Sequence, residues 1–419
     1  MTKCFALYFE YLFPLIPIVH EPTMRAGLQF VLAQHSQQRE SPHLQQSESP
    51  HSASWLSPPQ QSSELNSPFD DTNQPGYPTP WPQSIFTLVT ALCAESASIL
   101  PIQLFPEGRL VANAFLKASR SALHEYLDAD LEQPNANSLI IRYFHSNCLH
   151  AAGKSKTSWH IFGEAGRLAQ IMQLHDETSY TGLDAVEALL RRRVFWILYI
   201  GDKSAALLNQ RPITLHKFSF DPGITVAYSS EAVDHDGKST GTSSVDVPEQ
   251  SIMAGFNLNL RLWHAASDLL LELRVVREPL PNQGTGKSLT SYQRSHINSL
   301  YVNFMTCLDE LPRWLQISPG LFGTGPDGLD HPKAFVIQWV NLRVSFHCLR
   351  MAILRKFEDY EFMAPGGVQE QWGTQTLSKT EIARDMLQAL REAPFWALQV
   401  NGESCVSYLS TELDHWACK

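Results

Sequence analysis

The chain has 419 residues, 43% of them hydrophobic and 18% charged, with a formal net charge of −10. This composition is typical of a globular protein with one large domain or two to three average ones. The negative charge argues against a free-standing nucleic-acid binder, which usually carries a basic face. No apolar run approaches the roughly 20 residues that span a bilayer, so no membrane partner is expected.

The first 80 residues divide into two segments of different composition. Residues 1–35 are apolar and partly helical in pattern, and Glu10, Pro14 and Pro17 interrupt them too often for a signal peptide. Residues 36–80 are rich in Ser, Gln, Pro and His, which predicts a disordered insertion. Its Ser-Pro and Thr-Pro pairs suit either a solvated linker or a segment modulated by proline-directed phosphorylation.

Apolar residues recur at helical spacing through residues 81–220. Asn137 or Ser138 is a candidate N-cap for one of these helices, and Arg211-Pro212 ends the last of them because proline cannot continue the hydrogen-bond ladder. The spacing predicts helices over 85–99, 107–127, 137–149, 157–174 and 183–209.

Residues 221–249 have few large apolar side chains and predict a flexible loop. Residues 250–419 return to helical periodicity. The predicted helices there are 250–278, 290–317, 333–361 and 376–397. No alternating stretch is long enough to argue for a sheet, so the fold class is all-α, with about eight to ten helices around one core.

Two adjacent segments are distinctive. Residues 158–176 read SWHIFGEAGRLAQIMQLHD, and residues 187–212 read EALLRRRVFWILYIGDKSAALLNQRP. They resemble the middle homology region of fungal zinc-cluster transcription factors, in which a Ser-Trp helix precedes an Arg-rich helix that ends at Arg-Pro. YFEYLFPLIPIVHEPTM at 8–24, LDELPRWL at 308–315 and WVNLRVSFHCLRMAILR at 339–355 are similar to flanking parts of that region. Gln210 departs from the Gly that the family commonly has there.

The charged residues of the second segment have a structural interpretation. Glu187 lies four residues before Arg191, which favours an ion pair along the helix. Arg191, Arg192 and Arg193 cannot share one face, because successive residues turn by about 100°. We therefore expect at least one of them to be internal and paired, with Asp202 as a candidate partner; a contact with DNA or a ligand is the alternative. In the 157–174 helix, the glycines, Gly166 among them, predict close approach of another backbone.

The resemblance implies a DNA reader that this sequence does not contain. Family members bind DNA through six cysteines that hold two zinc ions within about 30 residues. The seven cysteines here lie at 4, 93, 148, 307, 348, 405 and 418, too far apart for a zinc cluster or a disulfide framework. They suit a reducing compartment such as the cytosol or nucleus. The resemblance begins near residue 8, so we expect either a truncated N-terminus or a member that works without its own zinc cluster.

Other chemical motifs are weak. PNQGTGKSL at 281–289 has Pro281 where a phosphate-binding loop needs glycine, and the histidine spacings do not match a zinc-protease helix. No catalytic, cofactor-binding, metal-binding or DNA-binding residue is therefore assigned, and no cofactor is expected in this chain.

Three functional hypotheses follow. The resemblance implies a nuclear, pathway-specific transcriptional regulator, for nutrient use or a secondary-metabolite gene cluster. It would reach promoter DNA through a missing zinc cluster or a partner factor, act as a homo- or heterodimer, and respond to a small-molecule effector. The alternatives are a DNA-binding-deficient cofactor, or a helical ligand-binding or scaffold protein with no transcriptional role. An enzyme with a site built from distant residues is the third hypothesis.

Overall fold

The computed structural model describes most of the chain, and all the regular elements in this part are helical, which confirms the all-α fold class. The described residues are 1–40, 82–208, 211–221, 223–228, 248–277, 290–316, 331–359 and 379–402. Most of the predicted insertion at 36–80, much of the predicted loop at 221–249 and the whole of 281–289 lie outside these residues. None of the described helices is long and apolar enough to cross a membrane.

The apolar opening segment folds into helical pieces separated by a bend. These are α1 (Thr2–Leu7), the π-helical turn η1 (Tyr8–Leu12) and α2 (Glu21–Glu40). Pro14 and Pro17 lie in the bend, where their lack of an N–H does not disturb a helix. The buried Tyr8 hydroxyl donates a hydrogen bond to the carbonyl oxygen of Ile16 at 2.6 Å, and this fixes the bend.

A group of helices follows close to the predicted positions. They are α3 (Pro82–Ile99), α4 (Gly108–Glu125), α5 (Leu127–Glu132), α6 (Ala136–Ala151) and α7 (Ser155–Ile171). The prediction of Asn137 or Ser138 as the N-cap of α6 is wrong. Asn135 is the cap, because its extended backbone lets its side chain accept a hydrogen bond from the Asn137 N–H, while Ser138 completes a capping box.

The remaining helices follow, and α8, α9 and α11 are the longest of them. They are α8 (Ala185–Leu208), α9 (Glu249–Arg277), α10 (Ser291–Thr306), α11 (Lys333–Asp359), α13 (Lys379–Glu392) and α14 (Phe395–Val400), with 3-10 turns at Glu177–Tyr180, Lys217–Ser219 and Arg313–Leu315. Two predicted helices were too long. The one over 290–317 ends at Thr306, ahead of Pro312, and the one over 376–397 is divided before Pro394.

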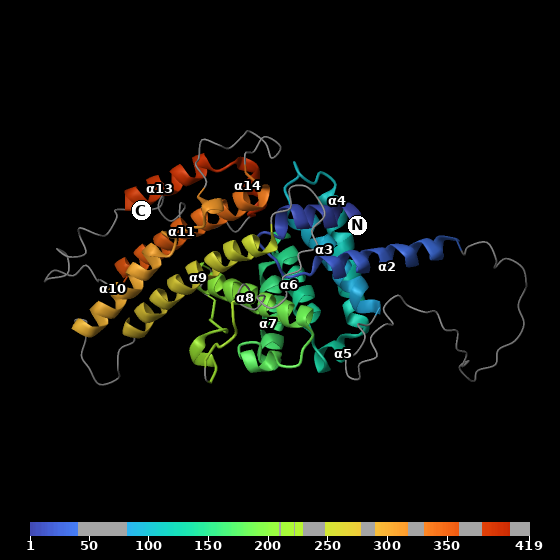
Figure 1. Ribbon diagram of the computed structural model, residues 1–419, viewed down its shortest axis with the longest axis horizontal. Coiled ribbons are helices and arrows are strands. Elements are labelled where there is room, and N and C mark those ends of the chain that lie inside the picture. Colours follow the sequence, from blue (N-terminus) through green and yellow to red (C-terminus); the bar gives the residue numbers. More distant parts are fainter. Residues whose placement is uncertain are drawn as a thin grey trace, which may run out of the picture.

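Helix α8 lies between two groups of helices (Figure 1). It packs against α6 and α7 on one side and against α9 on the other, while α10 and α11 pack on α9. The N-terminal segment joins the two groups. The side-chain amide of Gln338 on α11 donates hydrogen bonds to the carbonyl oxygens of Pro14 at 2.9 Å and Ile252 at 2.8 Å. One apolar cluster runs from Cys4 to Val400, so the described helices share a continuous core.

The close approach between α7 and α8 depends on a different glycine from those predicted. A Cβ atom at Gly163 or Gly166 would have no other atom within 4 Å, so no backbone approaches either of them. A Cβ atom at Gly201 on α8 would lie 2.8 Å from the ring of Phe162. The prediction for the α7 glycines is therefore wrong, and Gly201 is the residue that admits a neighbouring helix.

Candidate functional site

The three consecutive arginines of α8 each bind a different carboxylate. Arg191 pairs with Glu187 at 2.6 Å, as the spacing predicts. Arg192 pairs with Glu177 of the preceding 3-10 turn, and Arg193 pairs with Glu249 at the start of α9. Arg193 is 3% exposed, which confirms that at least one arginine is internal and paired. The ion pairs of Arg192 and Arg193 join α8 to neighbouring elements, whereas the Arg191–Glu187 pair lies within α8.

Asp202 is not the partner of these arginines, so that part of the prediction is wrong. Asp202 lies at the far end of α8, where its carboxylate accepts hydrogen bonds from the N–H groups of Thr214 at 2.9 Å and Leu215 at 3.1 Å. Its buried neighbour Lys203 lies 3.1 Å from the carboxylate and donates to the Leu215 carbonyl oxygen. The Asp202-Lys203 pair therefore holds the segment after Arg211-Pro212 against α8. The role is structural.

The same helix positions the segment 223–228. Glu177, held by Arg192, accepts a hydrogen bond from the Ala227 N–H at 2.8 Å. The indole N–H of Trp196 donates to the Ala227 carbonyl oxygen at 3.0 Å. The ring of Tyr228 stacks on that of Trp196, with 5.2 Å between centroids. The residues of the family-like motif therefore place the Tyr228 ring beside α9.

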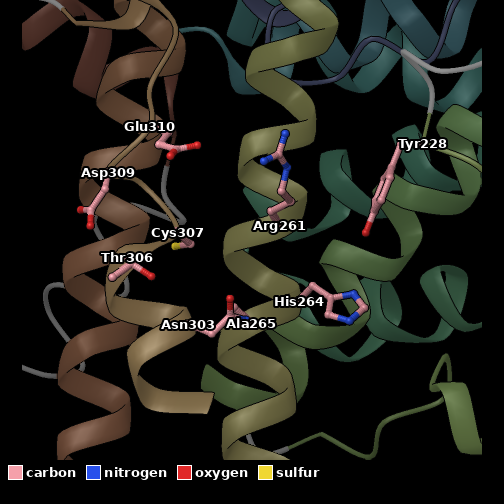
Figure 2. Close-up of a pocket in the computed structure, with 9 residues that line it drawn as sticks. All are labelled: Tyr228, Arg261, His264, Ala265, Asn303, Thr306, Cys307, Asp309 and Glu310. Carbon is pink, nitrogen blue, oxygen red and sulfur yellow. The ribbon is translucent and has the colours of Figure 1, made fainter. Parts of the chain in front are cut away.

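A pocket of about 430 Å³ lies between Tyr228, α9 and the end of α10 (Figure 2). This volume falls within the roughly 300–1,000 Å³ of pockets that hold small molecules. Three separate segments line it: Tyr228 from the first, Arg261, His264 and Ala265 from α9, and Asn303, Thr306, Cys307, Asp309 and Glu310 from the end of α10 and the following turn. We take this pocket as the candidate functional site.

The charges of the pocket are divided between its walls. Arg261 and His264 come from α9, and Asp309 and Glu310 come from the opposite side, where Figure 2 shows the Glu310 side chain directed toward α9. His264 is held by Asp268 at 3.4 Å one turn further along α9. Burial raises the pKa of the Cys307 thiol to about 12, so it is a neutral group between the two charged walls.

In the described part of the chain, no three His, Cys, Asp or Glu side chains are grouped so that they could hold a metal ion. His145 is hydrogen bonded to Ser119 at 2.8 Å, and burial lowers its pKa to about 3. His160 pairs with Glu164 on the surface of α7. The arrangement suits noncovalent binding.

Sequence reasoning did not find the pocket. Its residues come from segments separated by about 30 and 40 positions, and no local spacing connects them. The sequence contains one signal: the family-like stretch LDELPRWL at 308–315 includes Asp309 and Glu310.

Comparisons with known proteins identify a family and two curated relatives. Residues 6–273 match the family described as the fungal specific transcription factor domain. Over 139 residues the chain is 29% identical to the citrinin biosynthesis transcriptional activator mrl3 of Monascus ruber, a match that covers 32% of this chain and 25% of that protein. It is also 29% identical to the citrinin biosynthesis transcriptional activator ctnR of Monascus purpureus, over 32% of this chain and 22% of that protein.

The matched region thus spans about a quarter of the length of these curated relatives. No solved structure matches the chain.

Proposed function

The chain belongs to the family of fungal specific transcription factor domains, and from this membership we propose that it is the regulatory region of a pathway-specific transcriptional activator. The observation that carries the proposal is the family match over residues 6–273, more than half of the chain. The family and both relatives are described as transcriptional regulators, and the chain is not an enzyme. A nuclear location follows from the proposed role.

The pathway class is supported by the named relatives. Both are transcriptional activators of citrinin biosynthesis, which is the formation of a secondary metabolite. We therefore favour a secondary-metabolite gene cluster over nutrient use for the genes under control. DNA would be read by a zinc cluster outside this sequence or by a partner factor, because the seven cysteines of the chain are too dispersed to form one.

The pocket gives the regulatory region a means of control. An effector bound there would contact α9, the end of α10 and the segment that ends at Tyr228, and α8 holds that segment in place. If these elements can adopt two arrangements, an effector shifts the equilibrium toward the arrangement that it binds more tightly. The size of the shift is set by the difference between the effector's two affinities. We propose that this pocket is the effector site of the regulatory domain.

A transcription assay tests the main proposal. The 419-residue chain is fused to an unrelated DNA-binding domain and expressed with a reporter that carries the matching sites. We expect reporter expression to differ from that given by the DNA-binding domain alone. If the fusion is folded, nuclear and bound to its sites but leaves the reporter unchanged, the scaffold hypothesis without a transcriptional role is favoured instead.

A mobility-shift experiment tests the assignment of DNA reading to another element. The chain by itself, with a net charge of −10, is expected to give no sequence-specific complex with duplex DNA. A specific complex formed by the purified chain without zinc would contradict this assignment, while leaving the transcriptional role intact.

A further inference from the structure

We propose that the pocket between α9 and α10 binds a small zwitterion of the α-amino acid class, with its carboxylate on Arg261 and its ammonium group on Glu310, whose side chain is directed toward α9 (Figure 2). This inference rests on the proposed role of the pocket as an effector site. It concerns the chemistry of the ligand, which the family match does not specify.

The charged groups of the pocket are available to a ligand. Within the described part of the chain, Arg261 has no ion-pair partner, and neither Asp309 nor Glu310 has one. The α9 neighbour His264 differs, since it lies 3.4 Å from Asp268 and 3.4 Å from the Tyr199 hydroxyl. A guanidinium with no carboxylate of its own is well suited to bind a ligand carboxylate.

The opposite wall determines which carboxylates can bind. A simple anion on Arg261 would bring its charge toward Glu310, and a simple cation on Glu310 would face Arg261. Like charges that face one another oppose binding. A ligand that carries both a carboxylate and an ammonium group satisfies both walls, so the divided charge of the pocket favours a zwitterion over either singly charged molecule.

The remaining lining suits an apolar side chain. Tyr228 is held by its stack on the buried Trp196, so its ring contributes a fixed aromatic surface. Ala265 and the neutral Cys307 thiol add apolar contacts. Aromatic rings pack on one another in offset or edge-to-face arrangements. L-phenylalanine therefore combines the required charges with a ring that Tyr228 can contact, and it is the probe of choice.

The test compares L-phenylalanine with two analogues that each lack one charge. Calorimetric or ligand-observed NMR titrations of the full 419-residue chain use L-phenylalanine, N-acetyl-L-phenylalanine, which lacks the ammonium group, and 2-phenylethylamine, which lacks the carboxylate. We expect L-phenylalanine to bind about fivefold or more tightly than either analogue, since each charged contact lies in a partly solvated pocket.

Two variants assign the two charges of the ligand. Arg261→Gln should abolish the preference for L-phenylalanine over 2-phenylethylamine and retain the preference over N-acetyl-L-phenylalanine. Glu310→Gln should do the reverse. Arg313→Gln removes a nearby arginine that does not line the pocket and should leave all three affinities unchanged. All of these side chains are exposed, so the variants are expected to fold.

Three results would overturn the proposal. They are equal binding of L-phenylalanine and its acetylated analogue, affinities that do not respond to Arg261→Gln, and the absence of binding by any probe at about 10 mM, above the millimolar range of weak ligands. The reporter assay is independent of this titration. A chain that regulates the reporter but does not discriminate among the probes loses only this inference, whereas one that discriminates but does not regulate loses the proposed function.

Discussion

Replacing the buried Glu95 with glutamine should make the stability of the protein less dependent on pH. Glu95 on α3 is fully buried, and its carboxyl oxygens contact the Asn147 amide at 2.8 Å and the Cys148 thiol at 3.8 Å. No cation neutralises it in these contacts, so burial raises the pKa of Glu95 to about 8, above its ordinary value of 4.5. Between these two pKa values, the Glu95 carboxyl group is therefore neutral in the folded protein and ionised in the unfolded chain.

The sign and magnitude follow from proton linkage. Because the pKa of Glu95 is raised in the folded state, the stability that it contributes is fully present below the unfolded pKa of 4.5 and is lost as the pH rises toward about 8. The loss is about 1.4 kcal/mol per pH unit, so a rise from about pH 5.5 to about pH 8 removes about 3 kcal/mol from the free energy of unfolding. Glu95→Gln should escape this loss, because a neutral amide replaces the neutral acid.

Urea unfolding at the two pH values measures this effect. The free energy of unfolding of Glu95→Gln minus that of the unsubstituted chain should rise by about 3 kcal/mol between about pH 5.5 and about pH 8. Glu95→Ala should show the same pH dependence with a constant offset from the cavity that it leaves. A difference that is the same at both pH values would refute the reasoning, because it would mean that Glu95 is ionised in the folded protein.

Three further predictions concern packing and charge. Gly201→Ala should destabilise the fold by about 1–3 kcal/mol through contact with Phe162, whereas Gly163→Ala, in open space, should stabilise it by about 0.5–1 kcal/mol; thermal unfolding that ranks them in the opposite order would contradict this. Asp202→Ala leaves a buried lysine without its carboxylate and should cost about 3–5 kcal/mol in urea unfolding. Asp202→Asn also removes the charge and should cost nearly as much, so an Asn variant as stable as the unsubstituted chain would argue against a charge effect. Burial lowers the pKa of His145 to about 3, so its contribution to stability is lost as the pH falls below 6.5, and His145→Gln should show weaker acid destabilisation than the unsubstituted chain between about pH 6.5 and about pH 4.

Helical periodicity in the sequence was sufficient for the fold class and most of the helices. The apolar spacing in 85–99 and 183–209 predicted α3 and α8 because it repeats within one or two turns, and a helix is formed by contacts over that range. The Glu187–Arg191 pair was predictable for the same reason. The errors in the helix predictions lie at helix ends and caps. At the start of α6, for example, one local hydrogen bond makes Asn135 the N-cap instead of the neighbouring Asn137 or Ser138.

The sequence by itself determined that this chain forms an all-α protein of a recognisable family, since helical spacing and the distinctive segments at 158–176 and 187–212 are properties of neighbouring residues. Only the tertiary structure decided what the charged residues do. Arg193 meets Glu249 across 56 positions, and Asp202 binds the backbone at Thr214 rather than any arginine of its own helix. The pocket likewise exists only because α8 fixes Tyr228 beside α9 and α10. Its residues are far apart in the chain, so packing between helices, which no local pattern encodes, brings them together.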